Sequence, residues 1–131
     1  MQFKSILLGL TAGLLATAAY AAPVFNRIAS FPVELNSPEA ETTSSEIITA
    51  SEDGMTLVYS DSPAGGIGFI DITDAKAPKA GGFLALDGEP TSVTIIGSKV
   101  YAAVNTSESF TNPSGKLVVV DLATKAIEAT I

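Results

Sequence analysis

The sequence predicts an all-β fold built from four-stranded antiparallel propeller blades. Three observations predict it: residues that favour strands occur in short bursts, turn-forming residues separate the bursts, and the whole pattern occurs twice. The two copies occupy residues 46–87 and 90–131. Each has the strand number and the length of about 45 residues that are typical of one blade.

The first copy contains four expected strands, at residues 48–50, 56–59, 68–72 and 82–86. A Glu-Asp-Gly turn ending at Gly54 follows the first strand, a glycine-rich loop precedes the third, and Pro78 leads into the fourth. The third strand is apolar nearly throughout, which is typical of a strand that is covered on both faces.

The second copy repeats this order, with strands expected at residues 93–95, 99–104, 115–122 and 126–131. Matched positions are offset by 45 residues for Ile48 and Val93, by 43 for Gly54 and Gly97, and by 50 for Asp71 and Asp121. The offset changes only inside turns, where insertions cost little, as expected for true repeats.

Residues 26–35 resemble the fourth strand of the first copy, so a further strand is expected within residues 24–35, with which a ring of blades could be closed. Two blades and one strand are fewer than the roughly 4 to 8 blades of a complete propeller. The sequence also stops at Ile131, inside an expected strand. We therefore expect residues 22–131 to be a partial propeller domain whose partners are the remainder of a longer chain or other propeller blades; the alternative is a small stand-alone β domain.

Residues 1–21 have the pattern of an export signal peptide. Lys4 precedes an uncharged apolar stretch, and Ala19 and Ala21 have the small-residue spacing at which signal peptidase cuts. A retained membrane anchor is the alternative, but an apolar stretch of about 15 residues falls short of the roughly 20 in a spanning helix. We expect an extracytoplasmic protein, periplasmic or secreted, with no membrane insertion after cleavage.

The composition excludes several classes of site. The 131 residues contain no Cys and no His, so the sequence has no disulfide framework, no zinc cluster of the usual ligands and no Ser-His-Asp triad. The formal net charge is −7, and loss of Lys4 with the signal makes it more negative. Such an acidic chain is not expected to bind nucleic acid or an anionic membrane surface.

Two segments resemble the YVTN/LVIVD type of bacterial β-propeller repeat: the hairpin at residues 48–59 and the strand Gly-Lys-Leu-Val-Val-Val-Asp-Leu at residues 115–122. Residues 59–63, 68–72, 88–93 and 105–110 are further similar to the N-terminal propeller region of exported proteins named for an esterase-like activity of phytase, also labelled alkaline-phosphatase-like. The resemblance covers about residues 24–131. It implies a propeller whose esterase-like module lies further along the chain.

These observations lead to two functional hypotheses. The first is an exported propeller segment of an esterase- or phosphatase-like hydrolase, non-catalytic itself because the catalytic residues lie outside this chain. The alternative is an extracytoplasmic propeller that binds or holds a partner and has no enzymatic activity. The sequence contains neither an esterase G-x-S-x-G elbow nor a P-loop, and the glycines of residues 65–68 lead into a strand rather than the helix that a dinucleotide loop requires.

Asp71 and Asp121 occupy equivalent places at the end of the third strand of each copy. Their carboxylates are expected to accept backbone N–H bonds in the turns that follow. The alternative is that they bind a hard cation such as Ca²⁺, which prefers oxygen ligands. Repetition in both copies favours the role in the turns.

A second group of polar residues is expected at one end of the blades, where it would provide a ligand or metal site: Glu46, Asp61, Asn105 and Glu108. Carboxylates held together there could bind Ca²⁺ or transfer protons; otherwise they are ordinary solvated charges. Asp61 and Asn105 stand out because each follows the expected second strand of its copy. The loop of residues 106–114 is the longer of the two equivalent loops and could serve recognition. Its Phe110 is expected to pack the loop down, the alternative being an exposed anchor.

Overall fold

A computed structural model describes residues 24–131, and the expected export signal of residues 1–21 lies outside that range. Eight strands are present in the described part of the chain: β1 (Ile48–Ala50), β2 (Thr56–Asp61), β3 (Gly66–Asp71), β4 (Lys79–Ala85), β5 (Glu89–Ile96), β6 (Lys99–Asn105), β7 (Gly115–Asp121) and β8 (Ile127–Thr130). Every expected strand of the two copies is found, with ends that differ by a few residues.

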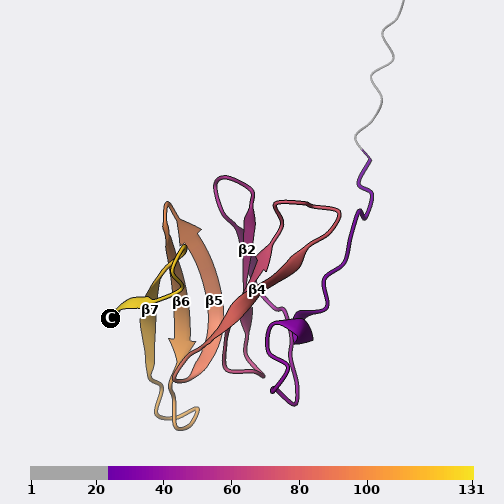
Figure 1. Cartoon of the computed structure of the whole chain (residues 1–131). Coiled ribbons are helices and arrows are strands. Elements are labelled where there is room, and N and C mark those ends of the chain that lie inside the picture. Colours follow the sequence, from indigo (N-terminus) through magenta and orange to yellow (C-terminus); the bar gives the residue numbers. More distant parts are fainter. Residues whose placement is uncertain (1–23) are drawn as a thin grey trace, which may run out of the picture.

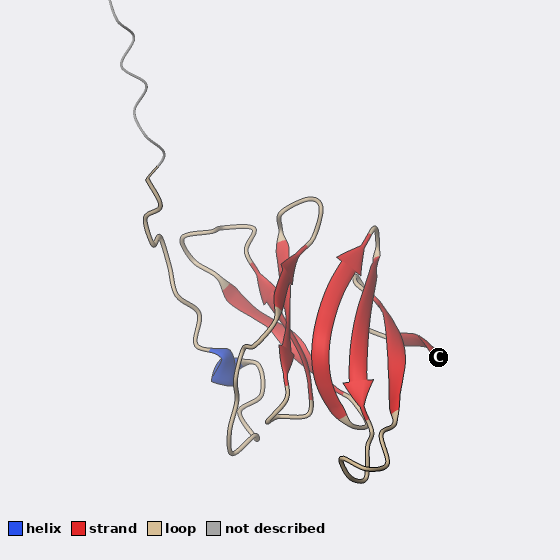
Figure 2. Ribbon diagram, turned by 180° about the vertical axis from the view of Figure 1, so that it is seen from behind, coloured by secondary structure: helices blue, strands red, loops and turns tan. Residues whose placement is uncertain are grey.

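The strands form two four-stranded antiparallel sheets, β1–β4 and β5–β8, each in chain order. Figure 1 and Figure 2 show the sheets standing side by side, with the N-terminal segment on the side of the first sheet that faces away from the second. The prediction of two antiparallel four-stranded units is therefore confirmed.

The hairpin registers show which residues of the two sheets are equivalent. Asp71 pairs with Thr56 at the end of the β2–β3 hairpin, and Asp121 pairs with Lys99 at the same place in the β6–β7 hairpin. The matched turn glycines, Gly54 and Gly97, both have positive φ angles, 69° and 58°. This is a backbone conformation that a side chain disfavours, so both turns depend on glycine.

The core lies between the two sheets, where β5 lies against β1, β2 and β3. We call the contributing surface of the first sheet its trailing face and that of the second sheet its leading face. The trailing face consists of Val58, Ile67 and Phe69, and the leading face of Val93, Val100, Ala102, Val104, Val118 and Val120. These aliphatic and aromatic side chains are at most 4% exposed, so their transfer from water drives the packing of the sheets.

The glycines of β3 make room for aromatic rings on the other face of the first sheet. A Cβ atom on Gly68 would lie 2.1 Å from the ring of Tyr59, and one on Gly66 would lie 2.5 Å from the ring of Phe83. The glycine-rich stretch therefore serves packing within the sheet, in agreement with the rejection of a phosphate-binding loop.

The expectation of a strand within residues 24–35 is wrong. Residues 24–32 have no regular structure, and Val33–Leu35 form a short 3₁₀ helix, η1. A strand needs an edge with which to pair, and these residues lie across the first sheet rather than along its edge: the Tyr59 hydroxyl contacts the Val33 carbonyl at 3.5 Å. Among the described residues no helix is long and apolar enough to cross a membrane.

Candidate functional site

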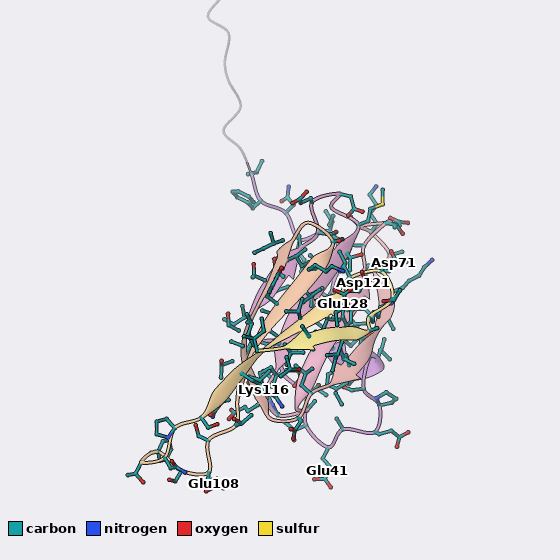
Figure 3. All side chains as sticks on the ribbon, turned by 90° about the vertical axis from the view of Figure 1, so that its left-hand side faces the viewer. Glu41, Asp71, Glu108, Lys116, Asp121 and Glu128 are labelled. Carbon is teal, nitrogen blue, oxygen red and sulfur yellow. The ribbon has the colours of Figure 1, made fainter. Side chains whose placement is uncertain are left out.

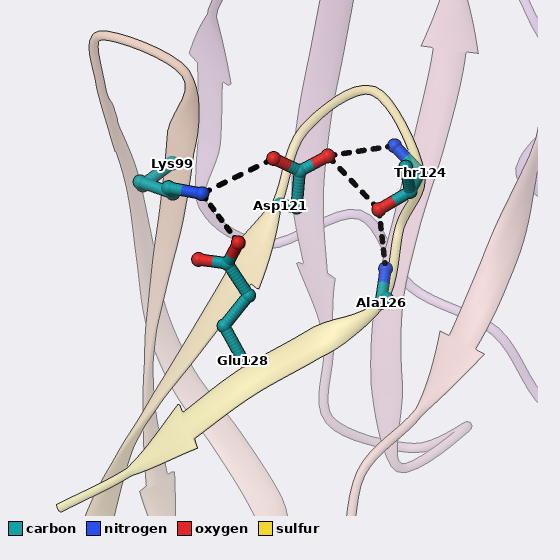
Figure 4. Close-up of polar contacts among 5 residues, drawn as sticks. All are labelled: Lys99, Asp121, Thr124, Ala126 and Glu128. Carbon is teal, nitrogen blue, oxygen red and sulfur yellow. Dashed lines mark hydrogen bonds and ion pairs between the residues drawn. The ribbon is translucent and has the colours of Figure 1, made fainter.

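The two aspartates that end β3 and β7 hold turns. Asp71 Oδ1 accepts bonds from the backbone N–H of Thr73 at 2.9 Å and from its hydroxyl at 2.7 Å. Asp121 Oδ1 accepts the same pair of bonds from Thr124, both at 2.9 Å (Figure 4). These are the contacts that the expected role in the turns requires.

Asp121 also belongs to an ion-pair cluster. Lys99 Nζ lies 3.1 Å from Asp121 Oδ2 and 2.5 Å from Glu128 Oε1 (Figure 4). The bonds from Thr124 and then from Lys99 lower the pKa of Asp121 to about 2, and the carboxylates of Glu128 and Asp121 raise the pKa of Lys99. Both shifts favour the charged forms of Asp121 and Lys99, and the two ion pairs link β6, β7 and β8.

Asp61 is buried rather than placed on the surface. It is the last residue of β2, has 0% exposure, and its Oδ1 accepts bonds from the backbone N–H groups of Ser44 at 2.9 Å and Ala64 at 3.1 Å. Its Oδ2 has no hydrogen-bond partner among the described residues. The carboxylate therefore ties the N-terminal segment and the β2–β3 turn to the sheet, and it presents no atom to solvent.

Glu46 lies just before β1 and contacts the same turn. Its carboxylate accepts a hydrogen bond from the Ser62 hydroxyl, and Ser62 Oγ also lies 2.7 Å from the carbonyl oxygen of Pro90 in β5. Ser62 thus links the two sheets, with Glu46 as one of its partners. Because the Asp61 carboxylate is buried whereas Glu46 is exposed, the two residues lie near one turn without forming a shared site.

Asn105 is not the structural equivalent of Asp61. The β6–β7 hairpin is one pair longer than β2–β3, so Asp61 opposite Gly66 corresponds to Val104 opposite Lys116, and Asn105 lies one residue further along. Asp61 and Asn105 therefore lie on opposite faces of their sheets. Asn105 Oδ1 accepts the Ser107 N–H at 3.0 Å and its Nδ2 lies 3.4 Å from Glu89 Oε2.

Within residues 24–131 no three Asp, Glu, His or Cys side chains are arranged to hold a metal ion. Figure 3 shows Glu108 on a loop that projects beyond the sheets, at the opposite end of the molecule from Asp71 and Asp121. The four residues expected to gather are thus divided among a buried carboxylate, two polar contacts and one exposed loop.

The loop of residues 106–114, which joins β6 to β7, is held by its own hydrogen bonds. The Thr106 N–H donates to the Ser114 carbonyl at 3.0 Å, and the hydroxyls of the same two residues lie 2.8 Å apart. Ser107 Oγ donates to the Ser114 carbonyl at 3.0 Å and accepts from the Ser114 N–H at 2.8 Å. A bridge between Ser109 and Asn112 closes the tip. The loop therefore has a defined shape without help from either sheet.

Phe110 stands at the tip of this loop and is fully exposed, at 107% of its reference area. The expectation that it packs the loop down is wrong, because the polar bonds at the base already do so. A hollow of about 400 Å³ lies beside the ring, lined by Phe110, Pro113, Asn105, Glu89 and Glu108 together with two serines. The best candidate for a functional site is therefore this loop and its hollow.

Nothing in the sequence indicates that Asn36 is structurally important, because this residue lies in a stretch that is polar and has no periodic pattern. Asn36 is 8% exposed, and its Nδ2 donates to the Phe69 carbonyl at 2.8 Å and to the Tyr59 hydroxyl at 3.1 Å. Its Oδ1 accepts from the Gly82 N–H at 3.2 Å. A single Asn followed by Ser-Pro carries no signal that distinguishes this role from that of an ordinary loop residue.

No protein-family model and no curated protein matches the sequence. Among solved structures, hydrazine synthase from Kuenenia stuttgartiensis, which has β-propeller domains, is similar with a TM-score of 0.53 and 16% identity. The similarity covers 66% of this chain and 23% of the hydrazine synthase chain, so this chain spans less than a quarter of that protein. At such low identity the likeness bears on the fold alone: the chain is all-β and its two sheets are propeller blades.

Proposed function

We propose that the chain is a non-catalytic binding module of an exported β-propeller protein. The observation that carries the proposal is the fully exposed ring of Phe110 on a loop that its own hydrogen bonds hold in shape. Because the loop is already ordered, a partner that covers the ring gains apolar burial without the entropy cost of ordering the loop. Aromatic side chains presented in this way are frequent centres of binding energy.

The charges beside the ring indicate the chemistry of the partner. Glu89 and Glu108 line the hollow, and Lys and Arg are absent from its lining. A partner with an apolar pocket bordered by basic groups complements this surface, and its cations can also interact with the face of the Phe110 ring. Binding should therefore weaken as the salt concentration rises.

The resemblance described from the sequence adds that this module belongs to an exported protein of the esterase-like phytase kind, with the hydrolytic groups elsewhere in that protein. The hydrogen bonds of the two carboxylates singled out support a non-catalytic role. Asp61 is buried against backbone N–H groups, and Glu46 is bonded to Ser62.

Site-specific photo-crosslinking tests the recognition role. Benzoylphenylalanine at position 110 should give a discrete adduct in the native extracytoplasmic compartment, whose mass identifies a protein or a small ligand. Phe25 is the matched control, because it is 99% exposed but lies in a segment without regular structure. Equal adducts at positions 25 and 110, or no adduct at 110, would contradict the proposal.

An activity assay tests the non-catalytic role separately. The purified chain should hydrolyse neither p-nitrophenyl phosphate nor p-nitrophenyl butyrate above the uncatalysed rate. Turnover that disappears in Asp61→Asn or Glu46→Gln, while thermal unfolding is unchanged, would assign chemistry to these carboxylates and refute the proposal.

A further inference from the structure

The two outer faces of the described chain carry apolar residues at positions equivalent to those that form the interface inside it. The hairpin registers allow this to be stated residue by residue, because β2–β3 and β6–β7 are superimposed by matching Asp71 with Asp121. On that basis each face of one sheet has a counterpart on the other sheet.

The outward face of the second sheet corresponds to the trailing face of the first. Tyr101 of the second sheet is equivalent to Val58 of the first, Leu117 to Ile67, and Val119 to Phe69. The strand pairing agrees with this match: Val58 lies opposite Phe69 in the first sheet, as Tyr101 lies opposite Val119 in the second. Ser60 lies opposite Ile67, as Ala103 lies opposite Leu117. In the first sheet these positions are fully buried against the second sheet. In the second sheet Tyr101 and Leu117 are half-buried and Val119 is buried, with no further sheet against them. Ile96 and Ile131 extend this apolar surface and are 63% and 78% exposed.

The outward face of the first sheet corresponds in the same way to the leading face of the second. The equivalent pairs are Ile48 with Val93, Leu57 with Val100, Tyr59 with Ala102, and Ile70 with Val120. Val93 and Val100 are 4% and 0% exposed in the core. On the outward face of the first sheet Ile48 is 53% exposed, whereas Tyr59 and Ile70 are already buried on the side that the N-terminal segment covers. The outward face of the second sheet thus corresponds to one side of the internal interface, and the outward face of the first sheet corresponds to the other side.

We infer that the outward face of the second sheet binds the outward face of the first sheet of another copy of this chain, head to tail. Such a contact repeats the geometry by which the two sheets already pack, so successive copies continue the same rotation. Heterologous contacts of this kind close into rings when the rotation permits. With two blades per copy, rings of two to four copies contain the roughly 4 to 8 blades of known propellers.

The N-terminal segment controls access to one of these faces. Asn36 anchors it over Tyr59 and Phe69, and residues 28–33 enclose an apolar hollow of about 330 Å³ against the face that carries Ile48 and Leu57. The incoming copy must displace or share this cover. Weakening the anchor should therefore strengthen association through the face that carries Ile48 and Leu57.

Light scattering coupled to size-exclusion chromatography tests the inference on the full chain, expressed for export and purified. The wild type should form a discrete species of two to four copies whose population rises with concentration. Leu117→Lys blocks the outward face of the second sheet, and Ile48→Lys blocks that of the first. Each should weaken association at least about tenfold, because a charge would be buried in an apolar contact. An equimolar mixture of the two variants retains one intact pair of faces and should form a dimer that goes no further.

Two more variants separate specific from unspecific association. Phe110→Ser removes the most exposed aromatic ring, which lies on neither face, and should leave the oligomer unchanged. Asn36→Ala should increase the population of the oligomer. Thermal unfolding confirms that each variant is folded, and Ile96→Lys, on the same face, replaces Leu117→Lys if that variant does not fold. A monomer at all concentrations, open-ended aggregation, or a mixture that fails to dimerise would overturn the inference.

Discussion

The side-chain amide of Asn36 provides the sharpest test of how the N-terminal segment is held, through the substitution Asn36→Ala. The amide supplies partners for the Phe69 carbonyl and the Gly82 N–H, at a place where the β3–β4 register shifts after Phe69. A third bond reaches the Tyr59 hydroxyl. The substitution removes all three bonds and leaves two main-chain groups of the bulge without their partner.

Each main-chain group left unpaired costs about 1–3 kcal/mol, and partial entry of water reduces the sum, so we expect a loss of about 3 kcal/mol in the free energy of unfolding. For a domain of this size that corresponds to a fall in Tm of roughly 12 °C. Asn36→Asp should be at least as damaging, because a carboxylate cannot donate to the Phe69 carbonyl and places a negative charge beside it.

Urea unfolding followed by circular dichroism, at a protein concentration low enough to keep the chain monomeric, measures the difference. Asn112→Ala is the matched control, because Asn112 is exposed in the loop of residues 106–114 and forms only a backbone bond there. If Asn36→Ala lies within about 0.5 kcal/mol of Asn112→Ala, the buried amide does not anchor the segment and the reasoning fails.

Two further predictions concern packing and charge. Gly68→Ala places a methyl group 2.1 Å from the Tyr59 ring and should cost about 3 kcal/mol or more by urea unfolding, whereas Gly54→Ala, with nothing within 4 Å but a φ angle of 69°, should cost about 1 kcal/mol; equal losses would show that the ring moves aside. The lowered pKa of Asp121, about 2, means that its carboxylate stabilises the fold above the unfolded-state pKa of about 4 and loses that contribution as the pH falls toward 2. Wild type should therefore exceed Asp121→Asn in stability at pH 6, and the difference should vanish near pH 2; a constant difference across that range would contradict the assignment.

The architecture could be predicted from the sequence because it rests on local signals. Alternating apolar residues, turn glycines such as Gly54 and Gly97, and the repeated Asp71 and Asp121 each act within a few residues along the chain. The eight strands and two sheets of the structure therefore lie where these local signals place them. The same locality explains why the bonds from Thr73 and Thr124 to these aspartates could be anticipated.

Only the tertiary structure decided which polar and apolar side chains are covered. Asp61 and Asn105 both follow the second strand of their copy in the sequence, but one additional residue pair in the β6–β7 hairpin places them on opposite faces of their sheets. Asp61 is then buried by the segment around Ser44, 17 residues earlier in the chain. Phe110 is exposed because serine and threonine bonds hold its loop away from the sheets. Burial of this kind depends on contacts between segments far apart in the chain and on strand register to within one residue. A local sequence pattern specifies neither of these.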